Sequence, residues 1–315
     1  MTRLSLGKHG KAMEFLQPTT LAEAIEAKAA HPGAVPIAGG TDVMVEINFD
    51  MRRPGALLDL TRVPELTCWE QASGDGVVRL GAGVTYARLI AELGGLLPGL
   101  AMAARTVGSP QIRNRGTIGG NLGAASPAGD CHPVLLAAGA AVQAASVRGT
   151  RLIPVAEFFL APKRNALHSD ELITSVLVPR ARGPQQFAKI GTRNAMVIAV
   201  CAFALELRPA RVGSGDEGSV GTGIGSAGPT PLRAPAAEEF LAGVLADAGL
   251  WESAGPLPDP VLRRFAELAA AAARPIDDVR GTAAYRRHAL AVLARRTLAW
   301  AWDSYRAGRG ASRCG

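Results

Sequence analysis

The pattern of apolar and polar positions in the first part of the chain predicts a helix followed by a buried strand. Thr20, with Glu23 three residues later, forms a capping box, and the apolar spacing after it is helical up to a stop at His31–Gly33. The short apolar run Val35–Ala38 is typical of a buried strand. This strand leads directly into the glycine-rich sequence 39–42, so we expect a rigidly placed turn there.

The pattern up to about residue 180 continues to alternate between strand and helix. Thr85 is expected as the N-cap of a helix that follows a strand, and a short helix that begins near Cys131-His132 is expected over 133–138, ending at Gly139. Further strands are expected at 56–60, 77–81, 141–147 and 171–178.

The stretch 108–130 interrupts this alternation. It holds six glycines and two prolines, which is more than a regular element tolerates. A loop of this length inside a compact domain is usually functional. We therefore expect an irregular segment with a binding role.

The pattern changes after Arg180–Pro184, which is typical of a linker. Strands are expected at 187–190, 197–208 and 218–224, and an Arg-rich helix at about 282–305. Asp259 is expected as the N-cap of another helix, with Pro260 in its first position. Strands followed by helices predict a second, α+β domain.

Two glycine-rich segments, 39–42 and 117–121, carry the candidate chemistry. A diphosphate needs several backbone N–H donors, and glycine lets the backbone approach it without a Cβ in the way. Thr41 and Asn121 can add side-chain donors, whereas Asp42 and Asp130 can accept from ribose or ribityl hydroxyls. Either segment alone could be a plain turn, but together they favour a dinucleotide site.

A third glycine-rich segment, 223–228, fits G-x-G-x-x-G but has Pro229 and Pro231 directly after it. A phosphate-binding fingerprint must open a helix at this point, and prolines beyond the first turn prevent that. We interpret the segment as a structural turn. The sequence contains no P-loop motif.

Composition narrows the classes of function. The net charge is +7, but the basic residues are spread out and aromatic residues make up only 5%, so nucleic-acid binding is not expected. Four cysteines (Cys68, Cys131, Cys201 and Cys314) lie far apart in the sequence, a spacing that excludes the familiar iron–sulfur and zinc patterns and indicates a cytoplasmic protein. Neither a metal site, nor a catalytic constellation, nor a membrane span is expected.

These motifs in this order resemble the FAD-binding (medium) subunit of the xanthine dehydrogenase and carbon monoxide dehydrogenase family of molybdenum hydroxylases. The matching segments of this sequence are 36–43, 112–121 continuing to Asp130, 187–193, 229–233 and 275–281 with Tyr285-Arg286. The resemblance covers nearly the whole chain.

The resemblance implies an α+β fold. A two-subdomain FAD-binding domain of the vanillyl-alcohol oxidase and p-cresol methylhydroxylase type would span residues 1–180, with subdomains of about 1–65 and 66–180. A smaller α+β C-terminal domain, like that of the CO dehydrogenase flavoprotein, would span 185–310. It implies noncovalent FAD on this chain, with a [2Fe–2S] cluster and the molybdenum cofactor on an iron–sulfur subunit and a molybdopterin-binding large subunit.

The resemblance also implies the site residues. The first and second glycine motifs would hold the diphosphate, Asp130 would bind nearby, Val107 and Ile173 would line the flavin, and Lys189 would approach the isoalloxazine. An ordinary surface lysine is the alternative for Lys189. The FAD-binding residues implied are Pro36, Ile37, Ala38, Gly39, Gly40, Thr41, Asp42, Val43, Val107, Thr117, Ile118, Gly119, Gly120, Asn121, Asp130, Ile173 and Lys189.

By resemblance, the chain is an oxidoreductase subunit that passes electrons from the iron–sulfur partner to NAD or another acceptor. The family often has an aromatic residue near the flavin after the strand of Lys189, and the sequence 193–196 has none. Two other hypotheses stay open: a self-contained FAD-dependent oxidase of the same fold, and a scaffold subunit without catalytic function.

Overall fold

The computed structural model describes residues 2–4, 13–71, 76–210 and 217–311, and Cys314 lies outside these ranges. The chain forms two compact units. Unit 1 comprises residues 1–89, 108–125 and 140–178, and unit 2 comprises 90–107, 126–139 and 179–315. Two segments from the first 180 residues therefore belong to unit 2, while the predicted domain limits at 180 and 185 stay a prediction.

The first sheet of unit 1 has the strand order β1-β2-β4-β3, in which β2 and β3 run parallel to β4. The predicted N-cap is confirmed: the Glu23 amide donates to the Thr20 hydroxyl at 3.2 Å, and α1 ends before His31. The Glu23 carboxylate accepts from the Thr19 amide at 2.7 Å, so the second bond of the predicted capping box is made one residue before the N-cap. The elements are β1 (Thr2–Leu4), β2 (Met13–Leu16), α1 (Leu21–Ala30), β3 (Val35–Ile37), α2 (Val43–Asn48), β4 (Ala56–Asp59) and the 3₁₀ turn η1 (Pro64–Leu66).

The second sheet of unit 1 has the order β5-β6-β11-β7-β8. Buried Val78, Leu80, Val142 and Val176 form part of its core. Its strands are β5 (Trp69–Gln71), β6 (Val77–Gly81), β7 (Ala141–Ser146), β8 (Gly149–Pro154) and β11 (Leu172–Pro179). The other elements of this region are α3 (Tyr86–Glu92), α8 (Val155–Phe158) and a hairpin of β9 (Phe159–Ala161) and β10 (Arg164–Asn165).

The predicted irregular segment 108–130 is in fact largely helical. It contains α5 (Pro110–Arg115) and α6 (Ile118–Ala124), and in this respect the prediction was wrong. Both helices are N-capped: the Ser109 hydroxyl accepts from Ile112 N at 3.4 Å and the Thr117 hydroxyl from Gly120 N at 3.0 Å. These caps, and the contacts of α6 with Ala82 and Val84 just after β6, outweigh the low helix propensity of glycine.

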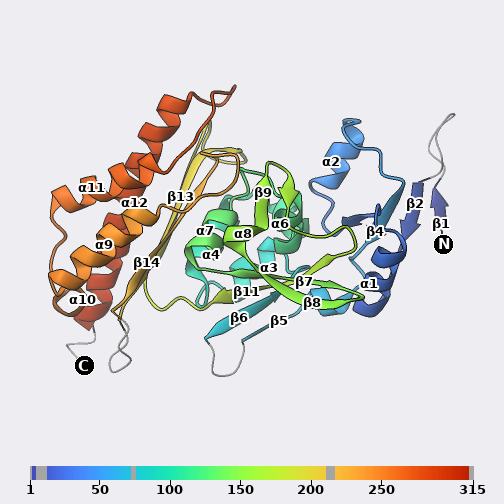
Figure 1. The fold of residues 1–315 in the computed structure, drawn as a ribbon, viewed down its shortest axis with the longest axis horizontal. Helices are drawn as coiled ribbons and strands as arrows, with labels where there is room; N and C mark the ends of the chain where they lie inside the picture. The colour runs from blue at the N-terminus through green and yellow to red at the C-terminus, as the bar shows by residue number, and fades with distance from the viewer. Residues whose placement is uncertain (1, 5–12, 72–75, 211–216, 312–315) are drawn as a thin grey trace. The chain divides into compact units, whose positions relative to one another are not determined.

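Unit 2 has a three-stranded antiparallel sheet with helices on both faces (Figure 1). Helices α4 and α7 contact one side, and α9, α11 and α12 cover the other, where alternate residues of β13 enter the core. The elements are α4 (Pro98–Thr106), α7 (His132–Ala137), β12 (Gln185–Gly191), β13 (Ala199–Arg208), β14 (Ser219–Gly225), α9 (Pro235–Asp247), α10 (Leu250–Ser253), α11 (Asp259–Ala271) and α12 (Ala283–Ala311).

Two sequence predictions in unit 2 are tested by this geometry. The segment 223–228 is the end of β14 and a turn, with no helix opening there, as expected; a Cβ on Gly223 would lie 1.9 Å from the Pro133 carbonyl oxygen, so this glycine admits α7. The expected N-cap Asp259 is the first residue of α11, and Pro258 occupies the N-cap position. That prediction was wrong by one residue.

Among the described helices of both units, none combines the length and the apolar composition that a membrane span requires.

Candidate functional site

The first glycine motif connects β3 to α2 in unit 1. Gly40 has φ +75°, a backbone conformation that favours glycine. A Cβ built on Gly39 would lie 1.9 Å from the carbonyl oxygen of Arg115, the last residue of α5. The turn at Gly39 therefore packs directly on the segment that precedes the second motif, and the structure brings the two motifs together.

The backbone amides of the first motif donate to no acceptor in the described part of the protein. From Gly39 to Val43, five consecutive N–H groups have no hydrogen bond to any described residue. Backbone donors are almost always paired when they are buried. A run of five without protein acceptors is therefore available to solvent or to a ligand with several acceptor oxygens.

The amides of the second motif are used inside the protein. Ile118 N donates to Val84 O at 3.1 Å, Gly119 N to Ala82 O at 2.9 Å, and Asn121 N to Thr117 O at 3.0 Å. With Gly120 N on the Thr117 hydroxyl, no amide from 118 to 121 is left over. Unpaired backbone donors are therefore found in the first motif, and the diphosphate contacts of both motifs stay predictions.

The two glycines of the second motif differ in what surrounds them. Gly119 is buried, and a Cβ there would lie 2.5 Å from the Ala82 Cβ and 2.7 Å from its carbonyl oxygen. Gly120 is exposed, and only the Thr117 hydroxyl, at 3.0 Å, is near the same position. Protein packing requires Gly119, whereas it leaves open why residue 120 is glycine.

The side chains of the first motif leave polar groups accessible. Thr41 is half-buried and Asp42 lies at the surface. Desolvation by neighbouring protein atoms, followed by the Glu46 carboxylate, raises the pKa of Asp42, while Lys163 opposes the rise. Close to an anionic ligand, such a carboxyl group is suited to a hydroxyl partner.

The remaining predicted residues of unit 1 flank these motifs. Pro36 is exposed, whereas Ile37, Ala38 and Val43 are half-buried. Thr117 and Ile118 are buried at the start of α6. Ile173 on β11 is buried as well, and its Cδ1 lies 3.9 Å from where a Cβ of Gly123 would be.

The three predicted residues of unit 2 include a buried ion pair. Lys189 Nζ on β12 donates to Asp130 Oδ2 at 2.6 Å and to Thr106 O at 3.0 Å, and the Thr106 hydroxyl donates to the same carboxylate at 3.2 Å. The Lys189 side chain is only 8% exposed, which contradicts the surface-lysine alternative. Val107 directly follows α4 and is half-buried. The flavin contacts of Val107, Asp130 and Lys189 stay predictions.

The Asp130 carboxyl group retains one unused acceptor. Its Oδ1 is buried and has no hydrogen-bond partner among the described residues. Desolvation raises the pKa of Asp130, while Lys189 and the Thr106 hydroxyl oppose the rise. The neighbouring Cys131 is fully buried, and burial raises the pKa of its thiol, so it is a poor nucleophile for a covalent cofactor link.

Three further residues shape this region without a signal in the local sequence. Arg115 contributes its carbonyl oxygen, and Glu46 and Lys163 form an ion pair at 2.6 Å. Backbone contacts and pairs more than a hundred residues apart leave no local pattern. Among the described residues, no group of three or more His, Cys, Asp or Glu side chains could hold a metal ion.

The donor set of the first motif fits a diphosphate. Five free amides, a glycine turn and the open space beside Gly120 suit an oxygen-rich anion that the backbone must approach closely. The residues present thus fit the FAD that the family resemblance implies.

Comparison with known proteins agrees with this geometry. Residues 11–181 match the family described as the FAD binding domain in molybdopterin dehydrogenase, and 186–301 match the CO dehydrogenase flavoprotein C-terminal domain. The chain is 34% identical to the nicotinate dehydrogenase FAD-subunit of Eubacterium barkeri over 74% of its length and 80% of that protein. It is 31% identical to the nicotine 6-hydroxylase medium subunit of Paenarthrobacter nicotinovorans over 91% of its length and 96% of that protein.

A solved structure shows the same fold. It is a carbon monoxide dehydrogenase from Hydrogenophaga pseudoflava that lacks the Mo-pyranopterin moiety of its cofactor, with a TM-score of 0.82 at 27% identity over 93% of this chain and 98% of that chain. These matches confirm the predicted resemblance, the fold class and FAD as the cofactor. The chain therefore belongs to the molybdopterin dehydrogenase family, as an FAD-binding oxidoreductase subunit.

Proposed function

We propose that this chain is the electron-transfer subunit of a multi-subunit molybdenum hydroxylase, which takes electrons from a [2Fe–2S] partner and passes them to NAD or another acceptor. The observation that carries the proposal is the run of five amides, 39–43, which have no acceptor among the described residues and lie on a turn whose Gly39 packs on Arg115. The relatives, named as FAD and medium subunits of dehydrogenases and hydroxylases, support the same assignment.

The chain's own residues would bind and orient the cofactor. The amides of 39–43 would hold the diphosphate, the Thr41 hydroxyl would add a donor, and Asp42 would accept from a sugar or ribityl hydroxyl. Gly120 would leave space for the close approach. A bound flavin supplies the exchange between one-electron and two-electron carriers.

Partners must supply the other centres. The described residues contain no candidate metal cluster, so an iron–sulfur subunit and a molybdopterin-binding large subunit would carry them. A cytoplasmic location is part of the proposal, because Cys68, Cys131 and Cys201 are all free thiols.

Purification of the tagged chain from cells that express its natural partners tests the proposal. The expected product is yellow, releases FAD intact on denaturation, and elutes with iron–sulfur and molybdenum-cofactor subunits. Colourless protein that does not take up FAD would contradict the proposal. Turnover of a small alcohol or phenol by the isolated chain would instead support a self-contained oxidase, and a complex that works without flavin on this chain would support a scaffold.

A further inference from the structure

The β9–β10 hairpin of unit 1 is attached to the end of α6, the helix that carries the second glycine motif. At its tip, Lys163 N donates to the carbonyl oxygen of Ala125 at 2.9 Å. Both residues have positive φ, +57° for Lys163 and +45° for Ala125. Residues other than glycine hold this conformation only where the surroundings enforce it, and such positions cluster at functional sites.

Asn165 provides a second attachment to the same helix. Its Nδ2 donates to the carbonyl oxygen of Gly123 at 3.0 Å, and its Oδ1 accepts from Leu167 N at 3.2 Å. The last turn of α6 has carbonyl groups without helical partners. The hairpin satisfies two of these, and so fixes the C-terminal end of α6.

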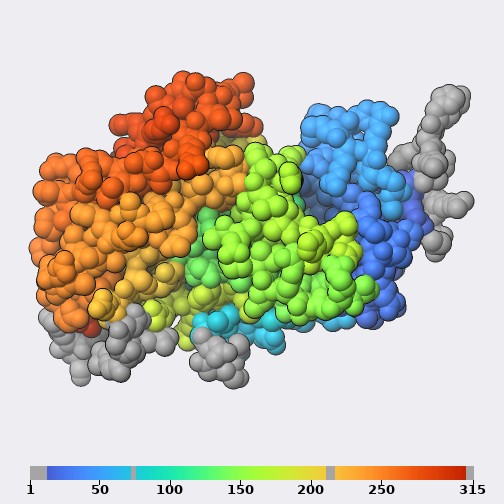
Figure 2. Space-filling view, viewed as in Figure 1, coloured from blue at the N-terminus to red at the C-terminus, as the bar shows by residue number. Residues whose placement is uncertain are grey.

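The same hairpin tip is attached to α2, the helix that follows the first glycine motif. Lys163 Nζ lies 2.6 Å from Glu46 Oε1. The Lys163 ammonium, with Arg52 beside it, holds the pKa of Glu46 below its ordinary value, so this carboxyl group is charged at neutral pH. None of the α2 residues is buried, and the helix lies at the surface in the light-blue part of unit 1 (Figure 2). The ion pair therefore joins the hairpin tip to a surface helix.

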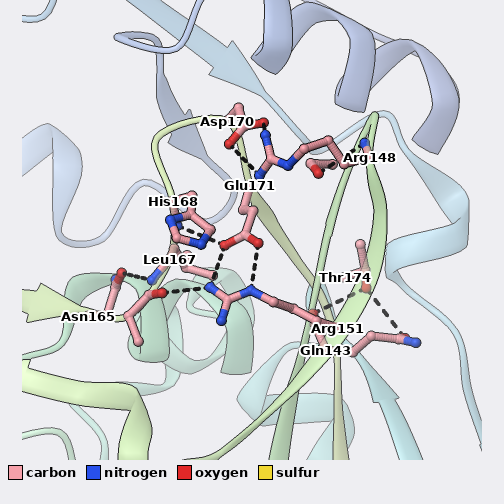
Figure 3. A network of polar contacts seen from close by, with 11 residues as sticks. Gln143, Arg148, Arg151, Asn165, Leu167, His168, Asp170, Glu171 and Thr174 are labelled. Atoms are coloured by element: carbon pink, nitrogen blue, oxygen red, sulfur yellow. Dashed lines mark hydrogen bonds and ion pairs between the residues drawn. The ribbon is translucent and has the colours of Figure 1, made fainter.

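The base of the hairpin is held firmly in unit 1 (Figure 3). Arg151 donates to both carboxylate oxygens of Glu171, at 2.7 and 2.8 Å, and to the Ala166 carbonyl oxygen at 2.7 Å. The His168 amide also donates to Glu171, at 2.7 Å. Because bidentate Arg–carboxylate pairs are geometrically specific, the hairpin can act as a fixed support.

Together, these contacts close a ring around the two motifs. One side is the close approach of Gly39 to the Arg115 carbonyl, and the other is the hairpin tip between α6 and α2. We propose that Lys163 is a positioning residue for FAD, which sets the spacing of the two glycine motifs by holding α2 to the end of α6. This inference rests on the proposed function.

The expected effect follows from the nature of the contact. The Lys163 side chain is 61% exposed and that of Glu46 20%, and partly exposed ion pairs of this kind contribute modestly. Loss of the pair would let α2 move relative to α6 in the absence of FAD. Binding of FAD would then have to order α2, and this cost would weaken the affinity by about fivefold.

The test is a titration of the flavin-free chain with FAD, followed by flavin fluorescence, together with the melting temperature of the flavin-free form. Lys163→Met is expected to raise the Kd for FAD about fivefold with little change in melting temperature. Lys163→Arg keeps the positive charge and is expected to bind FAD as tightly as the wild-type chain. In a double-mutant cycle with Glu46→Gln, the two changes are expected to be non-additive in FAD affinity.

The matched control is Arg148→Met. Arg148 pairs with Asp170 in the same unit, with side-chain exposures of 59% and 16% that resemble those of the Lys163–Glu46 pair, but it touches neither α2 nor α6. If Lys163→Met weakens FAD binding no more than Arg148→Met, or if it lowers the melting temperature and Lys163→Arg does not rescue affinity, the positioning role is overturned. A wild-type chain that does not bind FAD would instead overturn the proposed function.

Discussion

The two glycine motifs of unit 1 have similar compositions but opposite hydrogen-bond states. From Gly39 to Val43 no amide has an acceptor within the ranges that the structure describes, whereas from Ile118 to Asn121 every amide donates to a protein oxygen. The first motif therefore offers backbone donors. The second motif packs against Ala82 and Val84, and among its glycines only Gly120 is exposed. Glycine content alone does not distinguish these two roles. Only the partners of each N–H group do.

The largest expected effect is on stability, at the buried Gly119 of the second motif. Gly119→Ala places a Cβ 2.5 Å from the Ala82 Cβ and should lower the free energy of unfolding by about 3 kcal/mol or more. Denaturant unfolding of the flavin-free chain measures it.

The control lies on the same helix. At Gly123 a new Cβ would meet only the Ile173 Cδ1, at 3.9 Å, so Gly123→Ala should be neutral or slightly stabilising. If alanine at 119 and alanine at 123 had the same effect on the free energy of unfolding, the close packing of Gly119 against Ala82 would not be needed for the fold.

The next effect concerns the exposed glycine. Gly120→Val should keep the fold, at a cost of about 1 kcal/mol if the Thr117 cap is disturbed, and should weaken FAD binding about a hundredfold by occupying the diphosphate space. Titration of the flavin-free variant with FAD measures it, and Gly123→Val is the matched helical control. Unchanged affinity in Gly120→Val would remove Gly120 from the site.

A smaller effect concerns the Arg151–Glu171 ion pair, which holds the base of the β9–β10 hairpin. Arg151 holds the pKa of Glu171 below its ordinary 4.5, so the pair stabilises the fold fully above that pH and loses its effect as the pH falls through the lowered pKa. Arg151→Met should lower the free energy of unfolding by about 2 kcal/mol at pH 7. It should also make that free energy depend less on pH below pH 5. A variant with the wild-type pH dependence of unfolding would place the stabilisation elsewhere.

Local signals made much of the fold predictable. Thr20 with Glu23 marked α1, and the apolar run 35–38 marked β3 and the turn after it. The helices in 108–130 were missed because glycine content was given more weight than the caps at Ser109 and Thr117, which were present in the sequence. In addition, α6 is held by backbone hydrogen bonds from Ile118 and Gly119 to Val84 and Ala82, which are distant in the sequence.

The candidate site was predictable in its location and not in its chemistry. The motifs around Gly40 and Gly120 could be identified from residue types, and the structure brings them together through Gly39 and Arg115. Which amides are free, and the link through Lys163, depend on long-range contacts that no local pattern encodes.

Hydrogen–deuterium exchange of the backbone amides, with and without FAD, tests the central claim most directly. We expect FAD to slow exchange at residues 39–43, whose amides have no acceptor among the residues described, and to change exchange little at 118–121, where the amides are already bonded. FAD binding that leaves the exchange of 39–43 unchanged would contradict the claim that the first motif supplies the donors for the diphosphate.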